Sequence, residues 1–222
     1  MHHIRPLVTS AARGMRIMVA ALALGLLAGC ASTTMSTYRD PGTTGRSAMG
    51  SVAVFAIDGD LGSRQTVETV AVTRLTEATG TRAVRAIDLL PPTRNIPPEE
   101  ATRILQEAGI EGVLFLVLTD AYSDTYETPG TARTTGFGTL YGNSLYLHST
   151  TTYQRGHTYT RPRTEHELKL VDVRSGQVVW MSTSRTRGNA YAGDGTMADS
   201  LARSTVNALL REQLVKPVPQ AP

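Results

Sequence analysis

Thiols and long apolar runs are scarce in this 222-residue chain. It holds a single cysteine, so no disulfide can form within one molecule, and a packed core must stabilise the fold. No apolar run reaches the roughly 20 residues that a transmembrane helix needs. The sequence also lacks a Gly-x-Ser-x-Gly elbow and the spacing of a P-loop, two common signatures of hydrolases and nucleotide-binding enzymes.

The longest apolar run, residues 17–27, ends just before the only cysteine. Three arginines and no acidic residue precede this run, and small residues follow it. A basic segment, an apolar core and a small-residue cleavage zone are the parts of a secretory signal peptide. The end of the run also resembles the lipobox of bacterial lipoproteins, and the residues that carry this resemblance are Leu27, Ala28, Gly29 and Cys30.

The lipobox resemblance implies that Cys30 is the point of attachment to a membrane. In such lipoproteins the cysteine thiol receives a diacylglyceryl group, cleavage falls just before the cysteine, and the new amine is often acylated. Two or more acyl chains hold a protein stably, whereas one chain binds only marginally. Residue Ala31 is not aspartate, which by the sorting rule of Gram-negative lipoproteins implies the outer membrane, facing the periplasm. A compact signal could begin at Met15.

The formal charge of +3 belongs to the predicted signal peptide, residues 1–29, which holds three arginines and no acid. The chain from Cys30 onward carries 19 basic and 19 acidic residues, so its net charge is near zero. This balance gives no reason to expect a nucleic-acid partner. Its 193 residues are enough for one domain with a sizeable core.

The remaining chain divides into three parts. Residues 30–50 are rich in serine, threonine and glycine and show no apolar period, which predicts a lipidated, flexible tether. Residues 51–215 are predicted to form a single periplasmic domain. The proline-rich residues 216–222 are predicted to be a disordered tail.

Apolar periodicity within 51–215 predicts an α/β fold. A three-layer-like mixed sheet of about five strands is expected, with helices on its faces, because strands and helices alternate along the first half. The expected elements are a strand at 51–58, a helix at 64–79 capped by Gly80, a strand at 82–90, a helix from Pro97 to Gly109, a central strand at 113–118, a hairpin of 164–173 and 178–186, and a helix at 196–214 begun by Thr196.

Residues 126–163 interrupt this alternation with seven glycines or prolines and many threonines and tyrosines. They predict an irregular, β-rich excursion. Residues 144–153 fit one strand of a hairpin, whose partner lies near either 133–141 or 156–163. A partly disordered loop is an equally open alternative.

Three pieces of the sequence resemble a group of periplasmic lipoproteins. They are the opening strand 51–58, the hairpin 168–180 that ends in Trp180, and a last helix with Leu201 and Leu209 inward. The group contains the curli-secretion subunit CsgG, the synthase activator LpoB and the N-terminal domain of TolB. The resemblance implies a role in binding or assembly rather than catalysis. Its pore-forming member also implies an alternative, an oligomeric export-channel subunit, although residues 143–153 lack the apolar alternation of a membrane-crossing strand.

Tyrosines and arginines gather around the excursion, and these residue types commonly anchor protein interfaces. Loops also carry function more often than cores do. The sequence therefore predicts an envelope protein partner, or self-association, through Tyr126, Tyr141, Tyr146, Tyr153, Arg155, Tyr159 and Arg161. The alternative is an exposed and weakly ordered loop.

Two carboxylates, Asp58 and Asp60, follow the first strand and are weak candidates for a divalent metal site. No third ligand is visible, so a solvated turn is the favoured interpretation. A metal-dependent envelope hydrolase is the least favoured function. The histidines His148, His157 and His166 lack the helical spacing of a zinc site. No catalytic residue, cofactor or nucleic-acid partner is predicted.

Overall fold

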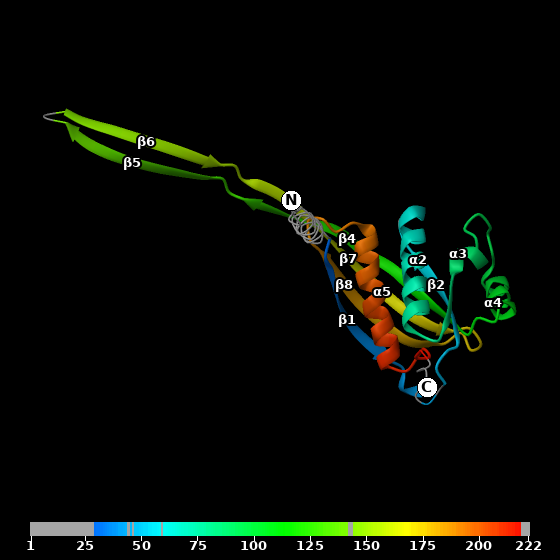
Figure 1. The fold of residues 1–222 in the computed structure, drawn as a ribbon. Coiled ribbons are helices and arrows are strands. Elements are labelled where there is room, and N and C mark those ends of the chain that lie inside the picture. Colours follow the sequence, from blue (N-terminus) through cyan, green and yellow to red (C-terminus); the bar gives the residue numbers. More distant parts are fainter. Residues whose placement is uncertain (1–28, 44, 46, 59, 142–143, 219–222) are drawn as a thin grey trace, which may run out of the picture.

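A computed structural model describes residues 29–43, 45, 47–58, 60–141 and 144–218, and the side chains of 134–149 are outside this description. The predicted signal residues 1–28, including Met15, Leu27 and Ala28, lie outside the described residues, as do 219–222. The described part forms an α/β domain from which a long β-ribbon projects (Figure 1).

A six-stranded mixed sheet forms the centre of the domain, which confirms the predicted fold class with one strand more than expected. Strands β2, β3 and β4 are parallel, and the remaining neighbours are antiparallel. The order across the sheet is β1 (Ala31–Arg39), β8 (Val178–Gly188), β7 (His157–Asp172), β4 (Gly112–Thr128), β2 (Ser51–Ile57) and β3 (Arg82–Arg85).

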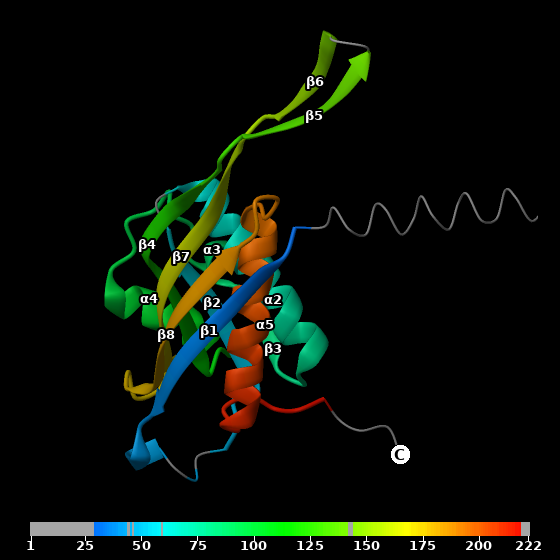
Figure 2. The same cartoon turned by 90° about the vertical axis from the view of Figure 1, so that its left-hand side faces the viewer.

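Helices lie on both faces of this sheet, although on one of them no helix of the described residues covers β1, β8 and β7 (Figures 1 and 2). The long helices α2 (Leu61–Ala78) and α5 (Asp194–Arg211) pack side by side on one face. The shorter α3 (Ala86–Leu89) and α4 (Pro98–Glu107) lie on the other face, beside β2 and β4. None of the helices that the structure describes is long and apolar enough to cross a membrane.

Alternation along β2 divides the core into two clusters, as the pleat of a strand requires. Val52 and Val54 belong to the larger cluster under α2 and α5, together with the fully buried Trp180. Ala53 and Phe55 belong to the smaller cluster, in which Leu105 of α4 packs. Both faces of β2 are therefore buried, which accounts for its unbroken apolar sequence.

The hairpin between β7 and β8 has the turn that its sequence predicts. Asp172 accepts hydrogen bonds from the backbone N–H of Ser175 at 2.8 Å and from its hydroxyl at 3.0 Å. Gly176 follows with a φ of 67°, in the left-handed region that favours glycine. The predicted helix stripe of α5 is also confirmed, because Met197, Leu201 and Leu209 are buried.

Replacing Gly176 with alanine is expected to destabilise the domain by about 1 kcal/mol, because a Cβ is costly in the left-handed region. No atom lies within 4 Å of that Cβ, so the cost comes from the backbone alone. The matched variant Gly195→Ala, in the first turn of α5, is expected to stabilise by about 0.5–1 kcal/mol. Urea unfolding measures both changes, and a destabilised Gly195→Ala would contradict this explanation.

The prediction of a flexible tether was wrong for residues 31–39. They form β1, which pairs along its whole length with β8, from Ala31 opposite Gly188 to Arg39 opposite Trp180. Hydroxyl groups take the place of an apolar stripe, since Thr33 Oγ1 lies 2.8 Å from Thr186 Oγ1 and 2.9 Å from Ser200 Oγ of α5. Such a strand has the composition of a linker but a half-buried face that carries polar side chains.

Several predicted boundaries and caps also differ from the structure. The strand predicted at 82–90 ends at Arg85, where the chain turns into α3. Gly80 does not have the left-handed conformation of the predicted helix cap. Its N–H instead donates a hydrogen bond to the Lys216 carbonyl at 2.8 Å, and Pro217 forms a β-bridge with Thr79. Residues 216 and 217 therefore belong to the folded domain and not to the predicted disordered tail. Helix α5 begins at Asp194 after a Gly193 cap, not at Thr196.

The excursion at 126–163 forms a regular two-stranded ribbon. Pairing of β4 with β7 continues to Thr128 opposite His157, and β5 (Thr131–Tyr141) then pairs with β6 (Ser144–Gln154). Of the two partners predicted for 144–153, the strand near 133–141 is confirmed. Since β8 stops pairing with β7 at Arg163, only two strands continue beyond that residue. Residues 123–162 are called the arm below.

Candidate functional site

The base of the arm carries a cluster of aromatic and arginine side chains. Register places Tyr126 opposite Tyr159 and Asp124 opposite Arg161, so all four residues share one face of the ribbon. The two tyrosine rings stack with centroids 5.6 Å apart and planes 15° apart. The Arg161 guanidinium lies 4.6 Å from the centroid of one ring and 5.2 Å from the other, a cation–π arrangement.

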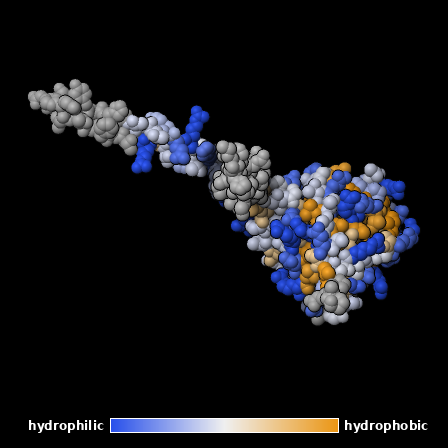
Figure 3. Space-filling model, viewed as in Figure 1, coloured by the Kyte–Doolittle hydropathy of each residue, from blue (hydrophilic) through white to orange (hydrophobic). Residues whose placement is uncertain are grey.

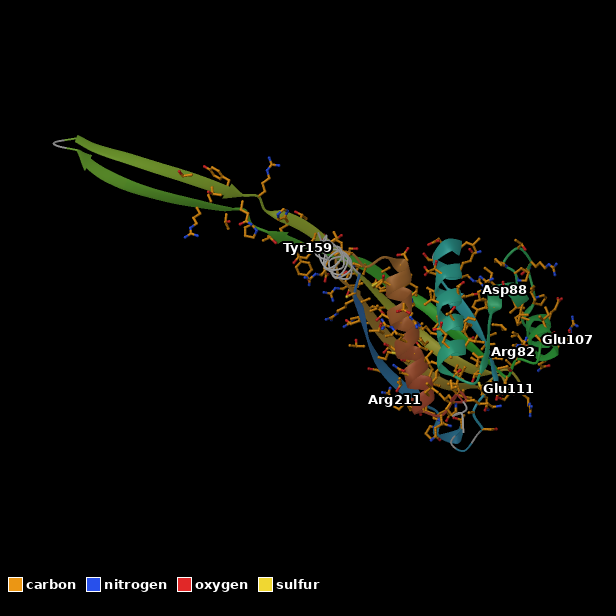
Figure 4. The ribbon with its side chains drawn as sticks, viewed as in Figure 1. Arg82, Asp88, Glu107, Glu111, Tyr159 and Arg211 are labelled. Carbon is orange, nitrogen blue, oxygen red and sulfur yellow. The ribbon has the colours of Figure 1, made fainter. Side chains whose placement is uncertain are left out.

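An ion pair fixes this cluster to the sheet. Arg163 pairs with Asp124, and its guanidinium also donates to the Tyr126 hydroxyl at 3.4 Å. Burial lowers the pKa of Arg163, but the hydrogen bonds to Tyr126 and Asp124 outweigh it and raise that pKa overall. Figure 4 places Tyr159 where the arm leaves the domain, far from Glu111 and Arg211 at the other end.

The structure brings together three of the seven predicted binding residues. Tyr126, Tyr159 and Arg161 form the cluster, whereas Tyr153 and Arg155 lie exposed farther along the arm. Tyr141 and Tyr146 lie on β5 and β6, and their side chains are outside the described ones. Sequence reasoning missed Asp124 as a member of this cluster, because its contact with Arg163 depends on the register between β4 and β7.

The arm has two open edges and little charge. β5 and β6 form a sheet of their own, so in the described part of the chain no third strand lies beside them. Residues 131–154 contain one charged residue, Arg133, and no acid. In Figure 3 the described part of the arm is white to blue, whereas apolar side chains gather on the domain body. Long edges without charge are the kind that accept another strand.

The two weak candidates for a metal site, Asp58 and Asp60, have different positions in the structure. Asp60 caps α2, accepting hydrogen bonds from the Ser63 N–H at 2.9 Å and the Ser63 hydroxyl at 2.6 Å. The side-chain bond from Ser63, followed by its backbone bond, lowers the pKa of Asp60. Asp58 immediately follows the last residue of β2, Ile57. Within the described ranges, no three histidine, cysteine or acidic residues lie close enough to hold a metal ion.

Two ionisable residues, Glu68 and His166, are buried in the core and are not part of the candidate site. Glu68 is fully buried, and its carboxylate accepts a hydrogen bond from Arg64 Nε at 3.0 Å. His166 is 7% exposed, its Nδ1 has no hydrogen-bond partner, and burial lowers its pKa to about 4. Neither role was predicted, although the Arg64–Glu68 spacing of four residues was a visible signal.

An open cavity of about 1030 Å³ lies at the end of the sheet away from the arm. Its apolar floor includes Met49 and Leu214, and its charged walls include Arg39, Glu111 and Arg174. Charges of both signs surround it, so the lining favours no single class of ligand.

Comparisons with known proteins find similar solved structures but no similar sequence family. No family model matches the sequence, and no curated protein sequence is similar to it. A PelC dodecamer from Paraburkholderia phytofirmans is 16% identical with a TM-score of 0.45, covering 83% of this chain and 99% of PelC. Lipoprotein GNA1162 from Neisseria meningitidis is 17% identical with a TM-score of 0.40, covering 73% of this chain and 99% of its own. Similarity at this level does not establish a shared function.

Proposed function

We propose that this protein is a lipid-anchored module of the bacterial cell envelope that assembles with other copies of itself through the arm. Acyl chains on Cys30 would hold it at the periplasmic face of the outer membrane. The observation that carries the proposal is the arm, a two-stranded ribbon with open edges and a single charged residue between 131 and 154. No catalytic role is proposed.

The energetics of the arm support assembly. An isolated two-stranded ribbon is marginally stable in water, and further strands or packing are needed to stabilise it. Proteins usually protect such edges with charged residues, prolines or bulges. Residues 131–154 contain no proline and only Arg133 as a charge. Pairing with another strand would satisfy the outer N–H and C=O groups of the ribbon.

A second copy is the occupant that fits these edges best. Each copy brings an identical ribbon of the same length, so repeated edge-to-edge pairing is self-complementary and can close into a ring. Anchoring to one membrane would raise the local concentration of copies and align their arms. A different envelope protein that supplies a strand is the alternative partner.

A second candidate function is an oligomeric export-channel subunit. The specific observation in its favour is that β5 and β6 are 11 residues each, close to the 9–11 residues of a membrane-crossing strand. Conductance in planar bilayers distinguishes the two functions. Assembled protein without conductance supports the accessory module, and conductance that the arm deletion abolishes supports the channel.

Photo-crosslinking in cells tests the proposed assembly. A photoreactive amino acid at Tyr153, which is 78% exposed on the arm, is expected to give multiples of the protein's own mass. The matched control is Tyr38, which is 58% exposed at the far end of β1 and is expected to give none. A crosslink from Tyr153 to another protein would identify that protein, and not a second copy of the chain, as the partner of the arm. The absence of any crosslink at Tyr153 would contradict the proposal.

A further inference from the structure

We infer that the end of the domain from which the arm leaves is a lipid-contacting surface, on which the protein rests against the bilayer. The anchor-end surface, as it is called here, consists of Ile57, Leu61, Tyr122, Tyr126, Arg187 and Tyr191. The partner is the headgroup and upper acyl region of the membrane that holds Cys30. The inference rests on the proposed lipidation of Cys30 and adds a second contact between protein and lipid.

Cys30 is fixed to the folded domain. Its carbonyl accepts a hydrogen bond from the Asn189 N–H at 2.8 Å, and β1 begins at the next residue. A lipid on Cys30 therefore brings the loop at 189–193 to the membrane surface, without a spacer between them.

The base of the arm lies at the same end of the domain as Cys30. Ala31 is opposite Gly188, and in the next rows Arg187 is opposite Arg163 and Arg163 is opposite Tyr122. Neighbouring strands are about 4.8 Å apart, so β1 and β4 are separated by roughly 14 Å across these rows. Figure 2 shows the start of β1 and the base of the arm at one end of the sheet.

The first turn of α2 also reaches this end. Ile57, the last residue of β2, is opposite Val117 of β4, six residues before the arm begins at Ser123. Leu61 opens α2 immediately afterwards. The anchor-end surface therefore combines residues from β2, α2, β4, β8 and the loop before α5.

Exposed apolar side chains are concentrated on the anchor-end surface. Ten large ones are exposed in the described part of the chain, and five of these belong to the anchor-end surface: Ile57, Leu61, Tyr122, Tyr126 and Tyr191. Tyr191 is 69% exposed and Leu61 is 54% exposed, values that are unfavourable for such residues in water. Tyrosine with an apolar ring and a polar hydroxyl is typical of membrane interfaces.

Arginines add polar contacts suited to lipid phosphates. Arg187 is exposed and lies opposite Arg163 on the next strand, and like charges directly opposite are unfavourable. Arg163 is already paired with Asp124, which leaves Arg187 to meet an anion from outside the chain. A guanidinium can bind phosphate with two parallel hydrogen bonds.

Site-specific quenching by spin-labelled lipids tests this surface in the full-length, lipidated protein reconstituted in nanodiscs. The variant Leu61→Cys supplies a single free thiol for an environment-sensitive fluorophore, since Cys30 is blocked by lipid. Val178→Cys is the matched control, because Val178 is 40% exposed at the opposite end of β8. Tyr191→Cys gives a second position on the surface and guards against a local effect at Leu61.

The expected result is at least threefold stronger quenching at positions 61 and 191 than at position 178. Only lipid contact gives this signal, so contact between copies of the protein cannot imitate it. Equally weak quenching at all three positions, with one label per chain, would overturn the lipid-contacting surface while leaving assembly intact. Two labels per chain would show a free Cys30 and would overturn the lipid anchor, and with it this inference.

Discussion

Replacing Glu68 with alanine is expected to destabilise the domain by about 3–5 kcal/mol, the cost of breaking a buried ion pair from one side. Its carboxylate accepts the N–H of Ala56 at 3.1 Å, the N–H of Ile87 at 3.1 Å and Nε of Arg64 at 3.0 Å. The variant would leave the buried N–H of Ala56 and the partly buried N–H of Ile87 without an acceptor. It would also leave the guanidinium of Arg64, only 15% exposed, without its counter-charge.

Glu68 also explains the end of β3. By holding the Ile87 N–H beside the end of β2, it directs the chain out of the sheet and into α3. The matched control is Glu77→Ala, since Glu77 is 58% exposed and pairs with Arg74 at 3.2 Å. That exposed pair is expected to be worth less than about 1 kcal/mol. Urea unfolding compares the two variants, and equal losses would contradict the role given to Glu68.

Acidification below pH 6.5 is expected to cost about 3 kcal/mol through His166 by the time the pH reaches 4. Burial lowers the pKa of His166 from 6.5 to about 4 in the folded state. The unfolded chain therefore takes up a proton between these values while the folded chain does not. The stabilisation is complete above pH 6.5 and is lost as the pH falls through this window.

The variant His166→Leu isolates this effect. His166 lies opposite Ser184 on β8, and neither its Nδ1 nor the Ser184 hydroxyl has a hydrogen-bond partner, so leucine leaves no new buried group unsatisfied. Its free energy of unfolding is expected to lack the step between pH 6.5 and 4. The control His157→Leu, at an exposed position, is expected to keep the step. A step that persists in His166→Leu would assign it to carboxylates instead.

Sequence patterns predicted most of the domain because its strands and helices bury apolar faces. The run at 113–118, for example, became the first part of β4, which lies between β7 and β2 in the sheet. The pattern failed at β1, where hydroxyl groups of threonine and serine make partly buried contacts in place of an apolar stripe. It also failed at 86–89, where the Ile87 N–H donates a hydrogen bond to the Glu68 carboxylate and the chain turns into α3 despite a strand-like sequence.

The residue types of the candidate site could be predicted from the sequence, but the contacts between them could not. Tyrosine and arginine enrichment located the arm, and Tyr126, Tyr159 and Arg161 do meet. Their contact depends on pairing between residues 33 positions apart, which periodicity alone does not fix. The shared location of Cys30 and the arm base depends on the same kind of information, because it follows from the order of β1, β8, β7 and β4 in the sheet.

The most direct measurement is the mass of the lipidated protein with and without the outer arm. Deleting residues 131–154 leaves Pro129, Gly130, Arg155 and Gly156 as a loop joining Thr128 to its partner His157. Since β5 and β6 form a separate sheet, the domain is expected to keep its stability within about 0.5 kcal/mol. Native mass spectrometry from nanodiscs is expected to give a multimer for the intact chain and a monomer for the deletion. Multimers of equal size from both chains would contradict assembly through the arm, as would a monomeric intact chain.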